Sequence, residues 1–192
     1  FKWIDDNNIE DTSYPKYAVA LERREWGNMY GFIKQISEGG NVICTGNEGC
    51  WPVLESQLPV YSQIYEEIKG IEKGAIGGIN REIEHLRLEI RGEEMGSKNE
   101  EKISRLEAQI KEEEARYREQ EEKLAKLYSE FGKEVVTITS VDGRDKEMPL
   151  GNVVRAYRPN SLGWFGKASL YLSKVWEFVS DEPREANTEG GV

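Results

Sequence analysis

Two cysteines, Cys44 and Cys50, are the residues of this chain best suited to redox chemistry. They flank a short glycine-bearing segment that could bring the two sulfur atoms together. In an oxidising compartment we expect them to form a small disulfide, whereas in the cytosol they would stay reduced. With a single histidine, His85, they do not supply the ligands of a zinc site, so we expect no bound metal and an exposed structural role for His85.

No catalytic motif accompanies the cysteines. The chain lacks a G-x-S-x-G elbow, a P-loop, an H-E-x-x-H pair and a dinucleotide fingerprint. The two-glycine run Thr45–Gly49 is typical of a turn rather than of a phosphate cradle. Asp5–Asp6 and the Asp142/Asp145 pair are expected in solvated loops, because nothing near them in the sequence would shift their pKa. We therefore expect neither catalysis nor a cofactor.

The charge balance argues against one class of partner. The net charge is −10, with 36 acidic against 26 basic side chains among 192 residues. A nucleic-acid-binding protein needs a basic surface to displace counterions, so we expect no nucleic-acid partner. The acidic excess is concentrated around Glu112–Glu122, where it indicates a solvated helix face. The length allows one or two domains with a core.

The middle of the chain predicts two long helices that fold back on each other. Apolar residues recur at helical spacing over Ile64–Ile90 and again over Ile103–Phe131. Between these stripes, Arg91–Ser97 shows no apolar period. We expect an antiparallel coiled-coil hairpin over residues 60–132, which would serve as an arm or spacer.

The second stripe follows the coiled-coil pattern more closely than the first. Its steps alternate between three and four residues if Glu113 and Gln120 occupy two of the seam positions. Ser97 and Glu100 have the spacing of a capping box, which predicts where this helix begins.

The first stripe contains an additional four-residue step, which locally unwinds a heptad supercoil. Four glycines fall in the same stretch, and each costs about 1 kcal/mol relative to alanine in a helix. Either they allow close packing against the second helix, which we favour, or they form a hinge in the arm. These glycines are Gly70, Gly74, Gly77 and Gly78.

Strand signals flank the helical segment on both sides. Residues 17–45 contain aromatic and β-branched runs broken by Gly and Asn, and residues 134–148 contain two such runs around Asp142–Gly143. An antiparallel helical pair returns the chain to where it left, so both parts can join one small head. We therefore expect an α+β fold, with a β-rich first head part (1–59) and a second part (133–160) that holds a β-hairpin and a short helix.

Residues 161–179 predict an amphipathic helix rich in aromatic side chains. So wide an apolar surface is either buried in a core or laid in a membrane interface, where Trp and Tyr are favoured. The polar segment 180–192 is expected to be a flexible tail. The candidate membrane-interface residues are Trp164, Phe165, Trp176, Lys167 and Lys174.

Several segments resemble one protein family. Asp181–Val192 is similar to the segment that enters the transmembrane core of PstA-type permeases, the membrane subunits of the bacterial high-affinity phosphate ABC importer. Leu150–Asn160 and the aromatic helix are similar to the stretch before that core in long-form members. Arg24–Gly31 and Ile71–Asn80 resemble the enlarged extracytoplasmic insert of the same proteins. The resemblance is most specific at the C-terminal end of the chain.

The resemblance implies that the chain is a periplasmic insert of an inner-membrane protein. The missing initiator Met, the cysteine pair and the lack of an apolar run long enough to span a bilayer fit this expectation. The tail, 180–192, would lead into a membrane helix, and Trp164, Trp176 and the two lysines would lie at headgroup level. The transmembrane core of the family is absent, so none of its phosphate-path residues can be assigned here.

We therefore expect a non-catalytic interaction or bracing module of the permease subunit. Its partners would be the phosphate-binding protein or the partner permease. Homodimerisation through the arm is possible but not required, since a hairpin can satisfy its own seam. The alternative is a stand-alone soluble coiled-coil scaffold whose C-terminal helix completes its core. Direct phosphate sensing is not expected, because the chain has no basic or glycine-rich nest.

Overall fold

The computed structural model describes residues 15–25, 27–96 and 99–180. The chain divides into two compact units. The first unit is built from the chain up to Leu58 and from Glu134 onward, and the second unit is Pro59–Lys133. The second unit begins and ends within one residue of the segment assigned to the helical hairpin from the sequence.

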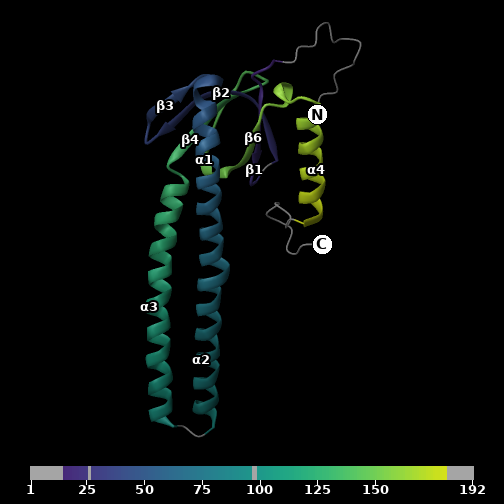
Figure 1. Ribbon diagram of the computed structural model, residues 1–192. Coiled ribbons are helices and arrows are strands. Elements are labelled where there is room, and N and C mark those ends of the chain that lie inside the picture. The colour runs from purple at the N-terminus through teal and green to yellow at the C-terminus, as the bar shows by residue number, and fades with distance from the viewer. Residues whose placement is uncertain (1–14, 26, 97–98, 181–192) are drawn as a thin grey trace. The chain divides into compact units, whose positions relative to one another are not determined.

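The first unit is built on an antiparallel sheet of six strands, and the predicted α+β class is confirmed. The strands follow the order β5-β4-β2-β1-β6, and β3 pairs with β2 beside that path (Figure 1). The strands are β1 Val19–Arg23, β2 Asn28–Glu38, β3 Asn41–Thr45, β4 Glu134–Ser140, β5 Asp145–Pro149 and β6 Val153–Tyr157.

The long strand β2 organises this sheet. Its first half pairs with β1, where Leu21 lies opposite Met29, and its second half pairs with β3, where Ile36 lies opposite Cys44. Strand β4 pairs with β2 from Gly31 to Glu38. At Gly31 the two strands approach so closely that a Cβ would lie 2.3 Å from the backbone oxygen of Thr139.

The core of the first unit has layers on both sides of the sheet. Successive side chains of a strand point to opposite faces, yet both Leu21 and Glu22 are almost fully buried. Strand β1 is therefore covered on both sides. The buried apolar side chains of this unit are Val19, Ala20, Leu21, Met29, Ile33, Ile36, Cys50, Leu54, Val136, Ile138, Met148, Leu150 and Val153.

Helix α1, Gly46–Lys69, corrects the sequence interpretation of residues 46–59 as part of a β-rich segment. Gly46 has a positive φ of 71°, which turns the chain from β3 into the helix. The side chain of Asn47 accepts a hydrogen bond of 2.6 Å from the backbone N–H of Ile33. Pro52 and Pro59 lie inside the helix and obscure its signal, because proline removes a backbone donor.

The second half of the first unit also differs from expectation. The predicted short helix is replaced by two single 3-10 turns, Leu150–Asn152 and Pro159–Ser161, and the strand β6 lies between them. Helix α4, Trp164–Ser180, then matches the predicted aromatic helix to within three residues at its start. The predicted tail lies outside the described residues beyond Ser180.

The second unit contains two helices that run antiparallel and pack against each other, α2 (Gly77–Met95) and α3 (Glu100–Phe131) (Figure 1). Asn99, not Ser97, caps α3, because its side chain accepts from the backbone N–H of Lys102 at 3.1 Å. Ser97 itself lies outside the described residues. Near the other end of α3, the ring of Phe131 contacts Tyr61 edge to face, with centroids 6.4 Å apart.

The packed face of α3 follows a regular pattern. The residues of α3 that are not exposed fall at alternating steps of three and four. All the remaining residues of α3 are exposed. Glu113 and Gln120 occupy two of these positions, which is the placement that the alternating pattern requires. The positions are Ile103, Leu106, Ile110, Glu113, Tyr117, Gln120, Leu124, Leu127 and Phe131.

The chain between α1 and α2, Gly70–Ile76, is π-helical. The N–H of Gly77 bonds the carbonyl of Glu72, five residues back, so this turn holds one more residue than an α-helical turn. The interpretation that the glycines allow close packing on the second helix is wrong. A Cβ at Gly70 or Gly74 would meet nothing within 4 Å, and one at Gly77 or Gly78 would meet only atoms of its own helical segment.

Candidate functional site

The side of helix α4 that faces the rest of the first unit carries small, polar and aliphatic residues and no aromatic one. Gly166, Leu170 and Ser173 are half-buried, and their steps of four and three place them on one side of the helix. Lys174, beside this row, is also half-buried. We call this the inner side of α4.

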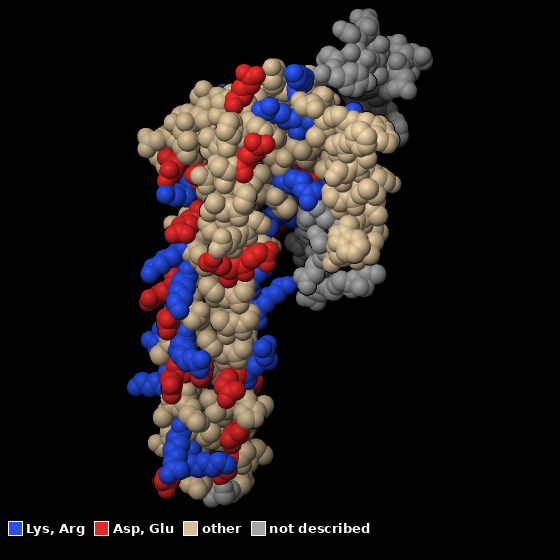
Figure 2. Space-filling model, in the orientation of Figure 1, with Lys and Arg blue, Asp and Glu red and all other residues tan. Residues whose placement is uncertain are grey.

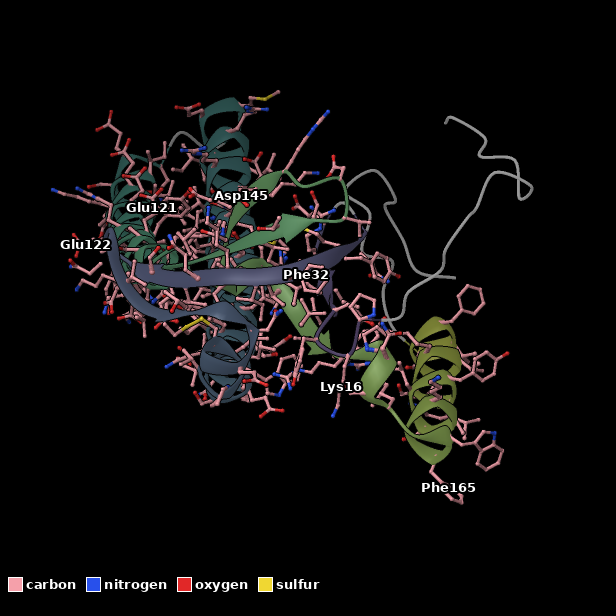
Figure 3. All side chains as sticks on the ribbon, turned by 90° about the horizontal axis from the view of Figure 1, so that it is seen from above. Lys16, Phe32, Glu121, Glu122, Asp145 and Phe165 are labelled. Carbon is pink, nitrogen blue, oxygen red and sulfur yellow. A yellow bond between two sulfur atoms is a disulfide. The ribbon has the colours of Figure 1, made fainter. Side chains whose placement is uncertain are left out.

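The opposite side of α4 carries the large apolar side chains and is exposed. Phe178 is 90% exposed and Phe165 is 82% exposed. Figure 2 shows α4 without charged side chains over most of its visible surface, and Figure 3 shows Phe165 pointing away from the sheet. This outer face consists of Trp164, Phe165, Tyr171, Leu172, Val175, Trp176, Phe178 and Val179.

The orientation of α4 is the reverse of a helix that completes a core. A surface helix normally turns its apolar stripe inward and its polar residues to water. A contiguous exposed apolar face of this kind is a mark of a protein or membrane interaction site. The candidate interface residues Trp164, Phe165 and Trp176 all belong to the outer face.

The two candidate lysines occupy different environments. Lys167 is exposed, as a headgroup-level lysine would be. The ammonium of Lys174 lies 2.5 Å from the carboxylate of Glu22 on β1, and Glu22 is 1% exposed. Lys174 therefore pairs with the sheet in this structure. Sequence reasoning missed this pair because Glu22 lies in an apolar strand with no signal that it meets a helix.

Cys44 and Cys50 form a disulfide, with their Cα atoms 5.2 Å apart. Cys44 lies in β3, and Cys50 lies fully buried in the first turns of α1. The segment between them was expected to be a loop. The structure instead places a tight turn at Gly46 and then the start of the helix, so the disulfide joins a strand to a helix.

The start of α1 carries a polar cluster that the sequence did not indicate. The guanidinium of Arg158 stacks over the ring of Trp51 at 4.2 Å and donates to the backbone carbonyl of Asn47 at 3.3 Å. The hydrogen bond from the hydroxyl of Tyr17 to the Glu48 carboxylate raises the pKa of Tyr17. These contacts join Tyr17, before β1, and Arg158, after β6, to the start of α1. We assign them a structural role.

A second cluster lies at the π-helical turn. The hydroxyl of Tyr128 donates to the carboxylate of Glu72 at 2.5 Å, and this bond is the main cause that raises the pKa of Tyr128 to about 12. The same bond, with that from Lys69 at 3.3 Å, lowers the pKa of Glu72. The ammonium of Lys69 also lies 5.4 Å from the ring centroid of Tyr65. The cluster joins α3 to the turn.

The acidic loop residues have closer neighbours than the sequence indicated. The carboxylate of Asp145 accepts from Lys34 at 2.5 Å and from Thr139 at 2.7 Å, which lowers its pKa. A hydrogen bond from Ser140 lowers the pKa of Asp142. The expectation of unperturbed carboxylates is therefore wrong, whereas Asp5 and Asp6 lie outside the described residues.

The remaining candidate, His85, is exposed and lies 3.5 Å from the carboxylate of Glu89. Within residues 15–25, 27–96 and 99–180, no group of three or more His, Cys, Asp or Glu side chains is arranged to hold a metal ion. In the same part of the chain, no helix combines the length and apolar character needed to cross a membrane.

The chain was compared with protein-family models, with curated proteins and with solved structures, and none of the three comparisons finds a match.

Proposed function

We propose that this chain is a non-catalytic periplasmic domain of the permease subunit of a phosphate ABC importer, and that the outer face of α4 lies in the membrane interface. The observation that carries the proposal is the outward orientation of the aromatic side chains of α4. A helix that leaves its aromatic side exposed offers that side to a lipid surface or to another molecule.

The composition of the outer face favours a lipid surface as its occupant. Trp164, Tyr171 and Trp176 combine a large apolar ring with a polar group, which is the combination favoured at the level of lipid headgroups. Moving one large apolar side chain out of water contributes roughly 1.5–3 kcal/mol. Several such residues on one face are sufficient to hold a helix in the interface plane.

Two further observations support the cellular setting. The disulfide between Cys44 and Cys50 is of the kind that persists in oxidising compartments such as the bacterial periplasm. The resemblance of the aromatic helix and of Leu150–Asn160 to long-form PstA-type permeases supports the same location. The disulfide does not depend on the outer face, whereas the resemblance shares the aromatic residues of α4 with it.

In this proposal α2 and α3 form an antiparallel coiled-coil arm. Support comes from the alternating steps of three and four between the packed positions of α3, which is the coiled-coil seam spacing. The charged remainder of α3 stays exposed to solvent. The arm would contact the phosphate-binding protein or the partner permease, or a second copy of itself.

The rival function, a stand-alone soluble scaffold, expects α4 to complete a core with its aromatic stripe. The exposure of Phe165, Trp176 and Phe178 disfavours that arrangement. The arm itself fits both functions, since a coiled coil suits a scaffold as well as a transporter domain. The two functions therefore differ in what α4 contacts, and the membrane assay below separates them.

The proposal is tested by sedimentation with vesicles of phosphatidylethanolamine and phosphatidylglycerol. The domain is expected to sediment with the vesicles, and the variant Trp164→Ser/Trp176→Ser is expected to stay in the supernatant. Leu88→Ser is the matched control, because Leu88 is a 53% exposed apolar residue of α2, outside the outer face, and it should bind like the wild type. A wild-type domain that stays in the supernatant would overturn the membrane assignment.

The partner assignment needs a separate experiment. A photo-reactive amino acid at an exposed position of the arm, such as Lys111 or Leu88, should crosslink to another importer subunit in membranes that contain the whole importer. The same group at Lys146, an exposed position of β5 in the first unit, serves as a comparison. Absence of crosslinks from every arm position to any importer component would remove the bracing role from the proposal.

A further inference from the structure

Two polar contacts join α4 to the sheet. The ammonium of Lys174 lies 2.5 Å from the carboxylate of Glu22, which is 1% exposed. One residue earlier on the helix, the hydroxyl of Ser173 lies 3.5 Å from the guanidinium of Arg155 on β6. Glu22 and Arg155 are neighbours across the β1–β6 pair. Two adjacent positions of α4 thus meet two adjacent strands.

Two contacts of this kind determine how α4 is rotated about its own axis. Consecutive residues of an α-helix point about 100° apart, since 3.6 residues complete one turn. A helix bonded through both Ser173 and Lys174 cannot turn far without breaking one of the two contacts. The outer face, on the far side of the helix, is thereby directed away from the sheet.

The sheet face under α4 could also accept apolar side chains. Ala20 lies two residues before Glu22 and therefore points to the same face of β1. Tyr30 of β2 and Tyr157 of β6 lie directly opposite Ala20 on the two neighbouring strands. Burial of apolar surface alone would favour turning the aromatic side of α4 onto this face. The polar contacts oppose that rotation.

We infer that Glu22 is a positioning residue that sets the rotation of α4, so that the outer face is presented outward and not packed on the sheet. The Glu22 carboxylate is buried in the sheet and cannot move far. Its bond to Lys174 therefore fixes that position of the helix. This inference deepens the proposed function and rests on it for the role of the outer face in membrane binding. The rotation of α4 can be measured on the isolated domain without a membrane.

The inference is tested in the variant Phe178→Cys, which changes the most exposed outer-face position. The rate at which a maleimide reagent labels this thiol is measured without lipid and without reductant. We expect labelling to slow by about tenfold or more in Glu22→Gln and Lys174→Met, because loss of the pair shifts α4 toward the inward rotation. Lys174→Arg keeps the charge and should label like the parent. Lys167→Met, at an exposed position of α4, should also label like the parent.

Equal or faster labelling in both Glu22→Gln and Lys174→Met would overturn the inference. If circular dichroism shows that Glu22→Gln does not fold, Lys174→Met decides the question, because Lys174 is partly exposed and its replacement leaves the sheet intact. The test is separate from the vesicle assay. Labelling that does not change removes the role of Glu22, whereas a wild-type domain that ignores vesicles removes the proposed function.

Discussion

At the scale of single residues, Gly31 tests the close approach of β2 and β4. A methyl group there would lie 2.3 Å from the carbonyl oxygen of Thr139 and 2.9 Å from a methyl group of Ile138. We expect Gly31→Ala to lower the free energy of unfolding by about 1–3 kcal/mol, because the two strands must separate. Denaturant titration measures the change.

Gly78→Ala is the matched control for this substitution. A Cβ at Gly78 would meet only the flexible end of Arg81, at 4.0 Å. Alanine in place of an unpacked helical glycine should raise the stability by about 1 kcal/mol. If Gly31→Ala proved as harmless as Gly78→Ala, the pairing of β2 with β4 in this register would be refuted.

The Tyr128–Glu72 hydrogen bond predicts a specific titration. Tyr128 ionises in the folded state near pH 12, above the ordinary tyrosine pKa of 10. The contribution of the bond to stability is therefore complete below about pH 10 and is lost as pH rises toward 12. At the acidic end it is lost as pH falls through the lowered pKa of Glu72, since protonation removes the charged acceptor.

Ultraviolet titration of the tyrosines should show this late ionisation step in the wild type and not in Tyr128→Phe. Tyr117→Phe, a substitution on the same helix, should leave the late step in place. Because Tyr128 is half exposed, the loss of stability in Tyr128→Phe should be at the lower end of the roughly 0.5–1.5 kcal/mol typical of a hydrogen bond. A late step that persists in Tyr128→Phe would show that another tyrosine is responsible.

Single residues were predictable where a repeating pattern determines them. The spacing of α3 placed even Glu113 and Gln120 on the packed face, because helix geometry leaves no other position for them. The capping residue was not predictable in the same way. Ser97 and Asn99 are both favoured caps two positions apart, and the choice of Asn99 depends on where the turn between the helices ends.

At the scale of elements, the π-helical turn explains the irregular first stripe. With the extra four-residue step, the stripe has one residue more than a regular heptad pattern, and the turn at Gly70–Ile76 absorbs it. Ile68 before the turn and Ile79 after it are consequently both buried.

Deletion of Gly77 should therefore be tolerated. The remaining steps would alternate between four and three from Ile64 onward, so a continuous α-helix would keep the downstream apolar residues on the packed face. We expect circular dichroism to show unchanged helix content and thermal unfolding to show an equal or higher melting temperature. Deletion of Leu86, which lies outside the turn, is the control and should be strongly destabilising. Equal damage from both deletions would contradict this account of the turn.

The disulfide is an element-scale prediction because it joins β3 to α1. Closing so short a loop contributes about 2 kcal/mol in the chain-entropy model. The variant Cys44→Ser/Cys50→Ser should consequently melt about 4–8 °C below the wild type. Thiol titration of unreduced, unfolded wild-type protein should find no free thiol, and two free thiols would contradict the bond.

Elements were predictable where the residue pattern is long. The helical pair, with its repeated apolar stripe, and the strands β2 and β4 have such patterns. The first turns of α1 were missed because Pro52 and Pro59 normally argue against a helix. Strand β6 was missed because its pairing with β1 joins distant parts of the chain.

At the scale of the whole molecule, the orientation of α4 could not be derived from its sequence. The same aromatic stripe fits a buried helix and a membrane-interface helix, since both require a wide apolar surface. What distinguishes them is the pairing of Lys174 with Glu22, two residues far apart in the chain. A sequence pattern within α4 does not contain this information.

The central claim, that the outer face of α4 lies in the membrane interface, is tested most directly by quenching of tryptophan fluorescence with brominated lipids. The domain mixed with brominated vesicles should lose part of its fluorescence, and Trp164→Phe/Trp176→Phe should abolish the loss. Trp51, which stacks against Arg158 and is not one of the outer-face residues, should not be quenched. Fluorescence that is unaffected by brominated lipid, or is quenched equally in the variant, would contradict the claim.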